Sequence, residues 1–391
     1  MTGVPTHLQH ILEQAYPAFS EGEIRRRRAA MEGTMAQFGV DHALIVGAFR
    51  VGPAIGWLTG WPVTQQGMLI LTPGEMPKLF IQYYNHLPNA REIARDCDVE
   101  WGLHVTLPNA IEEIKRRGGG TVGILGSLSV TQLVALKADF GHLVDLGPGY
   151  GPLRLVKSDE ELDWMRIGAA FSDMGVAALA DGLALGMNER QLGDLVERAY
   201  IAEGGLNVIH FMGVAAMDDP DCCVPRQYPR TREVRQGDML SCEITANFWD
   251  HGGQVLRSFT IGADPTPLYK DLHDTAEAAF AAIKGVLRAG THAQEIVDAA
   301  TLIDEAGFTI YDDLVHGFGG GYLPPILGIP SRPNHPVPDM TLEAGMVLVV
   351  QPNVITPDER AGVQTGEALI ITEDGTERLH DYPEGLGRID P

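Results

Sequence analysis

The sequence has 391 residues, of which 45% are hydrophobic and 21% charged, so it is typical of a globular chain that is too long for one ordinary core. Its formal net charge of −23 excludes the extended basic face that nucleic acids and anionic membranes require. We therefore expect neither of these partners.

The first 155 residues alternate helical and strand-like segments, which predicts a smaller N-terminal α/β domain. A helix is expected over Ser20–Phe38, because Ser20 and Glu23 form a capping-box pattern. The strands are expected in HALIVG, GMLILT, KLFIQYY, ARDCDVEWG and TVGILG, and two further helices over residues 110–117 and 130–140. The four arginines Arg25–Arg28 point around the helix in different directions, so we interpret them as a solvated helix start.

A seam rich in glycine and proline lies near Gly149–Ser158, and residues 156–391 are predicted to form a second domain. A long helix is expected after Ser158, followed by bunched helices and bunched strands, which favours an α+β arrangement with an antiparallel sheet. The expected helices cover residues 159–183, 188–203, 267–289 and 293–306.

Two strands, Met239–Phe248 and Val255–Ile261, are joined by a predicted turn at residues 250–253. Each carries a polar residue in an apolar setting: Glu243 on the first strand and Gln254 where the second begins. A buried carboxylate is costly unless it is paired, hydrogen-bonded or bound to a metal. Glu243 therefore either faces solvent or marks a site.

Three later segments also place polar residues within apolar strands or glycine-rich sequence. His316 lies in LVHGFGGGYL, Gln351 ends the run MVLVVQPNV, and Gln364 and Glu367 lie in GVQTGEALIIT. The GFGGG run is not interpreted as a phosphate loop, because it lacks the Lys-Ser/Thr end.

Taken together, LRLVKSDEELDWMRIGA, GDMLSCEI, VHGFGG, LEAGMVLVVQPNV and GVQTGEALIITEDG resemble the landmarks of the creatinase/aminopeptidase P/methionine aminopeptidase superfamily (peptidase M24), in order and spacing. The resemblance covers nearly the whole chain. It implies a C-terminal pita-bread domain preceded by a creatinase-type α/β domain, an overall α+β fold, and a homodimer.

The resemblance also places the metal-ligand positions of the superfamily. They fall on Glu243, Gln254, His316, Gln351 and Gly366, with Glu367 next to the last. A dinuclear Mn, Co or Zn centre needs several anionic oxygens, and a glutamine carbonyl is neutral. We therefore expect no metal cofactor; the alternative is one divalent ion (Mn, Zn or Co) on Glu243, His316 and Glu367.

Glu243, His316 and Glu367 are the candidate catalytic residues, as base, nucleophile, proton shuttle or water-orienting group. Glu243 could instead be a structural carboxylate, His316 a core histidine and Glu367 a strand-edge charge. The candidate substrate-binding residues are Arg226, Gln254, Gln351, Gln364, Arg332, His210 and Trp61. Arg226 would suit a substrate carboxylate or pair with Glu243, and each glutamine could serve only as a buried amide.

The leading hypothesis is a creatinase-like, metal-independent hydrolase of a small C–N compound such as an amide, amidine or cyclic amidine. One alternative is a mononuclear-metal Xaa-Pro peptidase-like or lyase enzyme. The other is a non-catalytic protein that uses the fold to bind a small molecule or peptide.

The four cysteines show no metal-binding spacing and no disulfide framework, so reduced thiols in the cytoplasm are expected. The N-terminal residues do not have the pattern of a signal peptide, and no window approaches the ~20 apolar residues of a membrane-spanning helix.

Overall fold

The computed structural model describes residues 3–49 and 51–391, which divide into two compact units. Glu13–Arg154 form the N-terminal unit, and Leu155–Pro391 form the C-terminal unit together with the segment that ends at Leu12. The packing of that N-terminal segment on the C-terminal unit differs from the expected single block over residues 1–155. No helix among the described residues is both long enough and apolar enough to cross a membrane.

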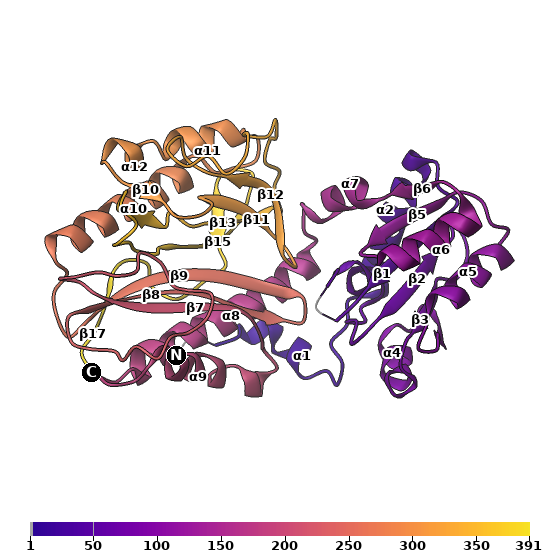
Figure 1. The fold of residues 1–391 in the computed structure, drawn as a ribbon, viewed down its shortest axis with the longest axis horizontal. Coiled ribbons are helices and arrows are strands. Elements are labelled where there is room, and N and C mark those ends of the chain that lie inside the picture. Colours follow the sequence, from indigo (N-terminus) through magenta and orange to yellow (C-terminus); the bar gives the residue numbers. More distant parts are fainter. Residues whose placement is uncertain (1–2, 50) are drawn as a thin grey trace. The chain divides into compact units, whose positions relative to one another are not determined.

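The N-terminal unit is a six-stranded mixed sheet in the order β4-β3-β2-β1-β5-β6, with helices on both faces (Figure 1). Alternate residues of β1 point to opposite cores: Ala43 and Ile45 pack with α2 and α3, whereas Leu44 and Val46 pack with α5 and α6. The elements are β1 (His42–Gly47), β2 (Gly67–Leu71), β3 (Lys78–Ile81), β4 (Asp98–Trp101), β5 (Val122–Gly126), β6 (Leu143–Asp145), α2 (Glu21–Phe38), α3 (Ala54–Thr59), α4 (Leu87–Ile93), α5 (Leu107–Arg116), α6 (Val130–Phe140) and α7 (Gly147–Tyr150).

The side chains of the arginine run differ from the predicted solvated helix start. Arg27 is 0% exposed, where its Nε donates to Glu23 at 2.6 Å and its guanidinium lies over Phe19. Arg28 donates to the carbonyls of Leu58 and Asp96. Two of the four arginines therefore hold α2 against α3 and the segment before β4 rather than facing water.

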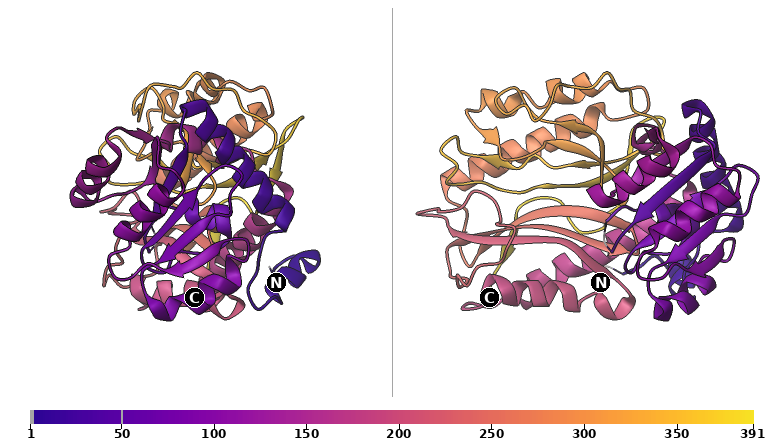
Figure 2. Two further views of the ribbon diagram at one scale, coloured as in Figure 1. Left: turned by 90° about the vertical axis from the view of Figure 1, so that its right-hand side faces the viewer. Right: turned by 45° about the vertical axis from the view of Figure 1, so that its right-hand side comes forward.

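The C-terminal unit is built on a curved nine-stranded sheet whose main path runs β12-β11-β13-β15-β9-β8-β7. Helices α8 and α9 lie on one side of it and α10 to α12 on the other (Figures 1 and 2). The helices are α1 (Gln9–Leu12), α8 (Asp159–Gly182), α9 (Glu189–Arg198), α10 (Pro267–Val286), α11 (Ala293–Ala299) and α12 (Leu302–Glu305); the strands are β7 (Leu206–Ala216), β8 (Asp238–Phe248), β9 (His251–Ile261), β10 (Thr309–Ile310), β11 (Val315–Phe318), β12 (Tyr322–Leu327), β13 (Val347–Val350), β14 (Val354–Ile355), β15 (Gly366–Ile371), β16 (Thr376–Arg378) and β17 (Gly387–Ile389).

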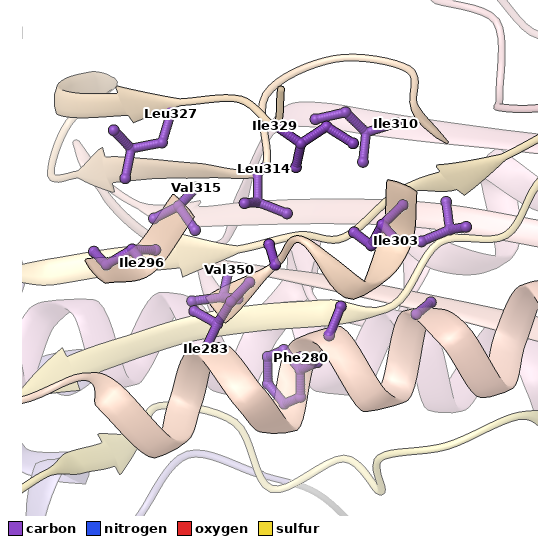
Figure 3. Packing of buried hydrophobic residues seen from close by; sticks show 14 of the residues in the cluster. Phe280, Ile283, Ile296, Ile303, Ile310, Leu314, Val315, Leu327, Ile329 and Val350 are labelled. Atoms are coloured by element: carbon purple, nitrogen blue, oxygen red, sulfur yellow. The ribbon is translucent and has the colours of Figure 1, made fainter. Parts of the chain in front are cut away.

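Local features on both sides of the sheet fix this architecture. Ser158 and Glu161 form the expected capping box at the start of α8, and a Cβ on Gly168 would lie 2.4 Å from the carbonyl oxygen of His251, so the helix can approach β9 closely only with glycine there. On the opposite side, Phe280 and Ile283 of α10 pack against Val315 and Val350 of the sheet (Figure 3). The α+β fold class is confirmed.

The sequence reading missed strand β7, which pairs with β8 along the edge of the sheet. The β8–β9 hairpin is longer than predicted, because β9 begins at His251 rather than at Val255 and only two residues separate it from β8, which ends at Phe248 as expected.

Candidate active site

The β8–β9 hairpin directs Glu243 and Gln254 to the same face of the sheet. Glu243 is paired across the strands with Leu256 and Thr245 with Gln254, so their side chains share one face. Glu243 is 5% exposed and Gln254 0%. The Gln254 Nε2 donates a hydrogen bond of 3.0 Å to Oε1 of Glu243.

Two further amides from distant segments join this pair. Gln254 Nε2 also lies 2.8 Å from Oε1 of Gln351, and Gln364 Nε2 donates to Oε2 of Glu243 at 3.4 Å. Gln351 Nε2 in turn donates to the main-chain oxygen (3.2 Å) and the carboxylate (3.3 Å) of Asp313. The structure thus brings Glu243, Gln254, Gln351 and Gln364 into one buried network.

His316 lies on the same face as Glu243, because β11, β13 and β15 align it with Val349 and Ala368. Its Nδ1 lies 3.1 Å from the carbonyl oxygen of Gly317, which can only accept, so Nδ1 carries the proton and Nε2 of the neutral ring is a free acceptor. Tyr322 stacks on the imidazole with ring centroids 3.9 Å apart.

The pKa values of the titratable side chains at the site are shifted mainly because these side chains are buried without an oppositely charged partner. Burial, and then the nearby Asp312 and Asp313, raise the pKa of Glu243 to about 8. Burial lowers the pKa of His316 to about 4, although the hydrogen bond to the carbonyl oxygen of Gly317 acts in the opposite direction. Burial also raises the pKa values of Asp312 and Asp313 to about 6 each. Near neutral pH the site therefore pairs a carboxylic acid with an unprotonated imidazole.

Glu367, a predicted catalytic residue, is not brought to this network. It is aligned with Val255 and Val350, so its side chain points to the opposite face from Gly366 and Glu243. There it accepts hydrogen bonds from Nη2 of Arg257 at 2.7 Å and from Nε of Arg378 at 2.5 Å. The structure corrects the predicted role: Glu367 is an ion-pair residue, and the alternative single-metal set of Glu243, His316 and Glu367 does not converge.

A family metal centre does not fit the residues at the site. Of the five ligand positions implied by the resemblance, only Glu243 supplies a carboxylate and only His316 an imidazole; two are amides and one is Gly366. The amides of Gln254 and Gln364 direct N–H donors at both oxygens of Glu243, whereas a metal ion requires acceptors. Among the described residues, no group of three or more His, Cys, Asp or Glu side chains has the spacing of a metal site.

Gly366 also cannot be changed back to a ligand, because its φ is +132° and a Cβ would lie 1.9 Å from the carbonyl oxygen of Val350. We expect Gly366→Ala to lower the free energy of unfolding by about 2 kcal/mol or more, through backbone strain and overpacking. Urea denaturation measures this loss. A Gly285→Ala variant, at a helical position with open space around the added Cβ, serves as the control and should be neutral or stabilising.

His210 and Arg226, two predicted substrate-binding residues, lie together away from the amide network. His210 is aligned with Ile244, so it faces away from Glu243, and its Nε2 lies 2.5 Å from the hydroxyl of Tyr200. Both residues line a cleft of about 830 Å³ between α9 and β7. The predicted Arg226–Glu243 ion pair is not formed.

The last two predicted binding residues have other contacts. Arg332 donates to the carbonyl oxygen of Tyr311 and to Glu359. Trp61 is 1% exposed in the hydrophobic core of the N-terminal unit, so it is a core residue there.

The sequence reading missed residues that complete the network. Asp312 and Asp313 lie in the connection between β10 and β11, and Asn353 Nδ2 donates to Asp312 at 2.9 Å. Two adjacent carboxylates directly before the apolar run that contains His316 were the available signal. The stacking of Tyr322 on His316 depends on the β11–β12 pairing, which the sequence alone does not reveal.

Comparison with known proteins gives a family. Residues 163–373 match the model of metallopeptidase family M24. The chain is 28% identical over 282 residues to the "Probable dipeptidase PepE" of Mycobacterium tuberculosis, covering 67% of this chain and 71% of that protein. It is 24% identical over 267 residues to the Xaa-Pro dipeptidase of Pyrococcus furiosus, covering 66% and 73%.

Solved structures share the fold at lower identity. An X-Pro aminopeptidase from Thermotoga maritima aligns with a TM-score of 0.80 and 17% identity, over 93% of this chain and 99% of that one. The dipeptidase PepE from Mycobacterium ulcerans aligns with a TM-score of 0.77 and 21% identity, over 96% and 100%. These structures establish the predicted pita-bread fold with its N-terminal α/β domain.

Proposed function

This chain belongs to metallopeptidase family M24, and from that premise we propose that it hydrolyses a C–N bond of a small amide, amidine or cyclic amidine without a metal ion. Family membership supports the hydrolase. The single observation that carries the finer proposal is the buried network in which Glu243 meets the amide of Gln254 and, through it, that of Gln351, where the family pattern has further ligands.

The protonation states assign a role to each residue. His316 Nε2 accepts a proton from water as the water oxygen attacks the carbon of the scissile bond. Protonated Glu243 donates its proton to the departing nitrogen, so that the C–N bond breaks and a neutral amine leaves. Gln254 and Gln351 hold the acid and the substrate in place.

The pH dependence follows from these roles. The imidazole must be unprotonated and Glu243 protonated, so we expect kcat/KM to rise through about pH 4 and fall through about pH 8. A profile measured on one cleaved substrate tests this. An activity that keeps increasing above pH 9 would rule out Glu243 as the acid.

A turnover screen of small amides, amidines and cyclic amidines tests the function itself. Glu243→Ala and His316→Ala should each abolish hydrolysis, whereas Glu373→Ala, at an exposed position, should retain it. A protein that binds compounds from the screen with unchanged affinity in both variants, and cleaves none, would be a binding protein instead. The homodimer and the cytoplasmic location expected from the sequence stay predictions.

A further inference from the structure

Three carboxylates near the active site have only neutral partners. Glu243 accepts from the amides of Gln254 and Gln364, whereas Asp312 and Asp313 accept from Asn353 and Gln351, respectively. Hydrogen bonds of 3.0, 2.8 and 3.3 Å connect Glu243 to Asp313 through Gln254 and Gln351. No arginine, lysine or histidine forms an ion pair with any of the three in the part of the chain that the structure describes.

Six other buried carboxylates of the chain pair with an arginine or a histidine. Glu23, Glu113, Glu189, Asp238 and Glu367 each hold one or more arginines, and Asp173 holds His380, in every case at 2.9 Å or less. Removing a carboxylate from water without a counter-charge is costly, so these pairs are the expected arrangement. Among the described residues, no side chain supplies such a counter-charge to the carboxylates at the active site.

Arg332 is the cation that acts on Asp312, but it is already engaged. Its guanidinium donates to Glu359 at 2.6 Å and to the carbonyl oxygen of Tyr311 at 3.1 Å. It therefore balances Glu359 rather than the three carboxylates.

A second, independent observation is that several buried polar atoms around the carboxylates have no hydrogen-bond partner. Four atoms are buried and have no hydrogen-bond partner: Oε1 of Gln254, Oε1 of Gln364, Oδ1 of Asn353 and Nε2 of His316. Their residues are at most 2% exposed. Because each amide spends its N–H group on a carboxylate and Nδ1 of His316 carries the proton of the ring, the atoms left over are acceptors, and a ligand rich in donors would satisfy them.

We propose that Asp312 and Asp313, next to the acid Glu243, form the recognition site for a small cation that carries several N–H donors, of the amidinium or guanidinium type. Such a group supplies both the missing positive charge and donors for the orphaned oxygens. A neutral amide presents a carbonyl oxygen to a site that already has too many acceptors, and an anion is repelled. Asp312 and Asp313 are then specificity residues, which select the cationic substrate.

This inference rests on the proposed function in one respect: the cation is taken to bind at the same site at which the reaction occurs. The test uses the full chain and needs no turnover. Acetamidinium, its neutral isostere acetamide, and tetramethylammonium, which has the charge but no N–H group, are titrated at fixed ionic strength by calorimetry. We expect acetamidinium to bind at least about tenfold more tightly than either control.

Asp312→Asn and Asp313→Asn should each weaken acetamidinium binding about tenfold, whereas the exposed Asp374→Asn should not. Thermal melting checks that each variant is folded; should one fail to fold, the comparison of the three probes on the wild-type protein decides. Equal binding of acetamide, equal binding of tetramethylammonium, or displacement of acetamidinium by stoichiometric Mn²⁺ would overturn the inference. Hydrolysis of neutral amides without a preference for acetamidinium would overturn it too, and leave the proposed reaction standing.

Discussion

Replacing Glu243 by glutamine is expected to make the protein more stable at pH 8 and nearly inactive. The fall in activity, about 10²- to 10⁴-fold in kcat, reflects the loss of the acid that protonates the departing nitrogen. The gain in stability reflects the pKa of about 8, because the unfolded chain releases this proton near pH 4.5 and the folded one holds it.

The direction of the pKa shift of Glu243 determines the pH range over which the variant and the wild type differ in stability. A carboxyl group with a raised pKa contributes stability that is fully present below about pH 4.5 and is lost as the pH rises to about 8. The difference between Glu243→Gln and wild type should therefore be near zero at pH 4.5 and reach on the order of 4 kcal/mol at pH 8. Urea denaturation at several pH values measures it, with Glu373→Gln as the exposed control. Equal destabilisation by Glu243→Gln at both pH values would contradict the account.

Replacing Glu367 by glutamine is expected to have the opposite consequence for stability. The carboxylate is 0% exposed and neutralises Arg257, which is 2% exposed, so the variant leaves a buried guanidinium without a counter-charge. We expect a loss of about 3–5 kcal/mol in the free energy of unfolding at pH 7. The exposed pair of Glu377 with Arg166 provides the control, and Glu377→Gln should cost about 1 kcal/mol or less.

The pH dependence again follows from the direction of the shift. Burial raises the pKa of Glu367, but Arg378, His380 and Arg257 together lower it by more than burial raises it. The pKa therefore lies below its ordinary value of 4.5. The loss caused by Glu367→Gln should be complete above pH 4.5 and shrink as the pH falls through the lowered pKa. A stable Glu367→Gln variant that has lost only its activity would restore the catalytic role that the sequence predicted.

The sequence predicted the fold and much of the network for one reason. Apolar periodicity located the strands, and polar residues such as Glu243, Gln254 and His316 stood out because they interrupt apolar runs. The glutamines at the family's ligand positions then identified a site with too little charge for a metal pair.

The prediction failed where one residue decides which face a side chain takes. Gly366 and Glu367 are neighbours on β15, so a step of one residue moves the carboxylate from the site to the opposite face. The predicted substrate-binding role of His210 on β7 was wrong for the same reason, because its side chain points to the face opposite to that of Glu243. Ion-pair partners such as Arg257 for Glu367 come from separate strands, and the spacing of residues within one segment does not reveal them.

Metal analysis of the active protein tests the central claim most directly. The protein is purified without chelator, its metal content is measured by mass spectrometry, and hydrolysis of a substrate from the screen is assayed before and after dialysis against chelator. We predict substoichiometric metal and an unchanged rate. Two ions per chain, or a rate that vanishes with chelator and returns with Mn²⁺ or Zn²⁺, would contradict the account.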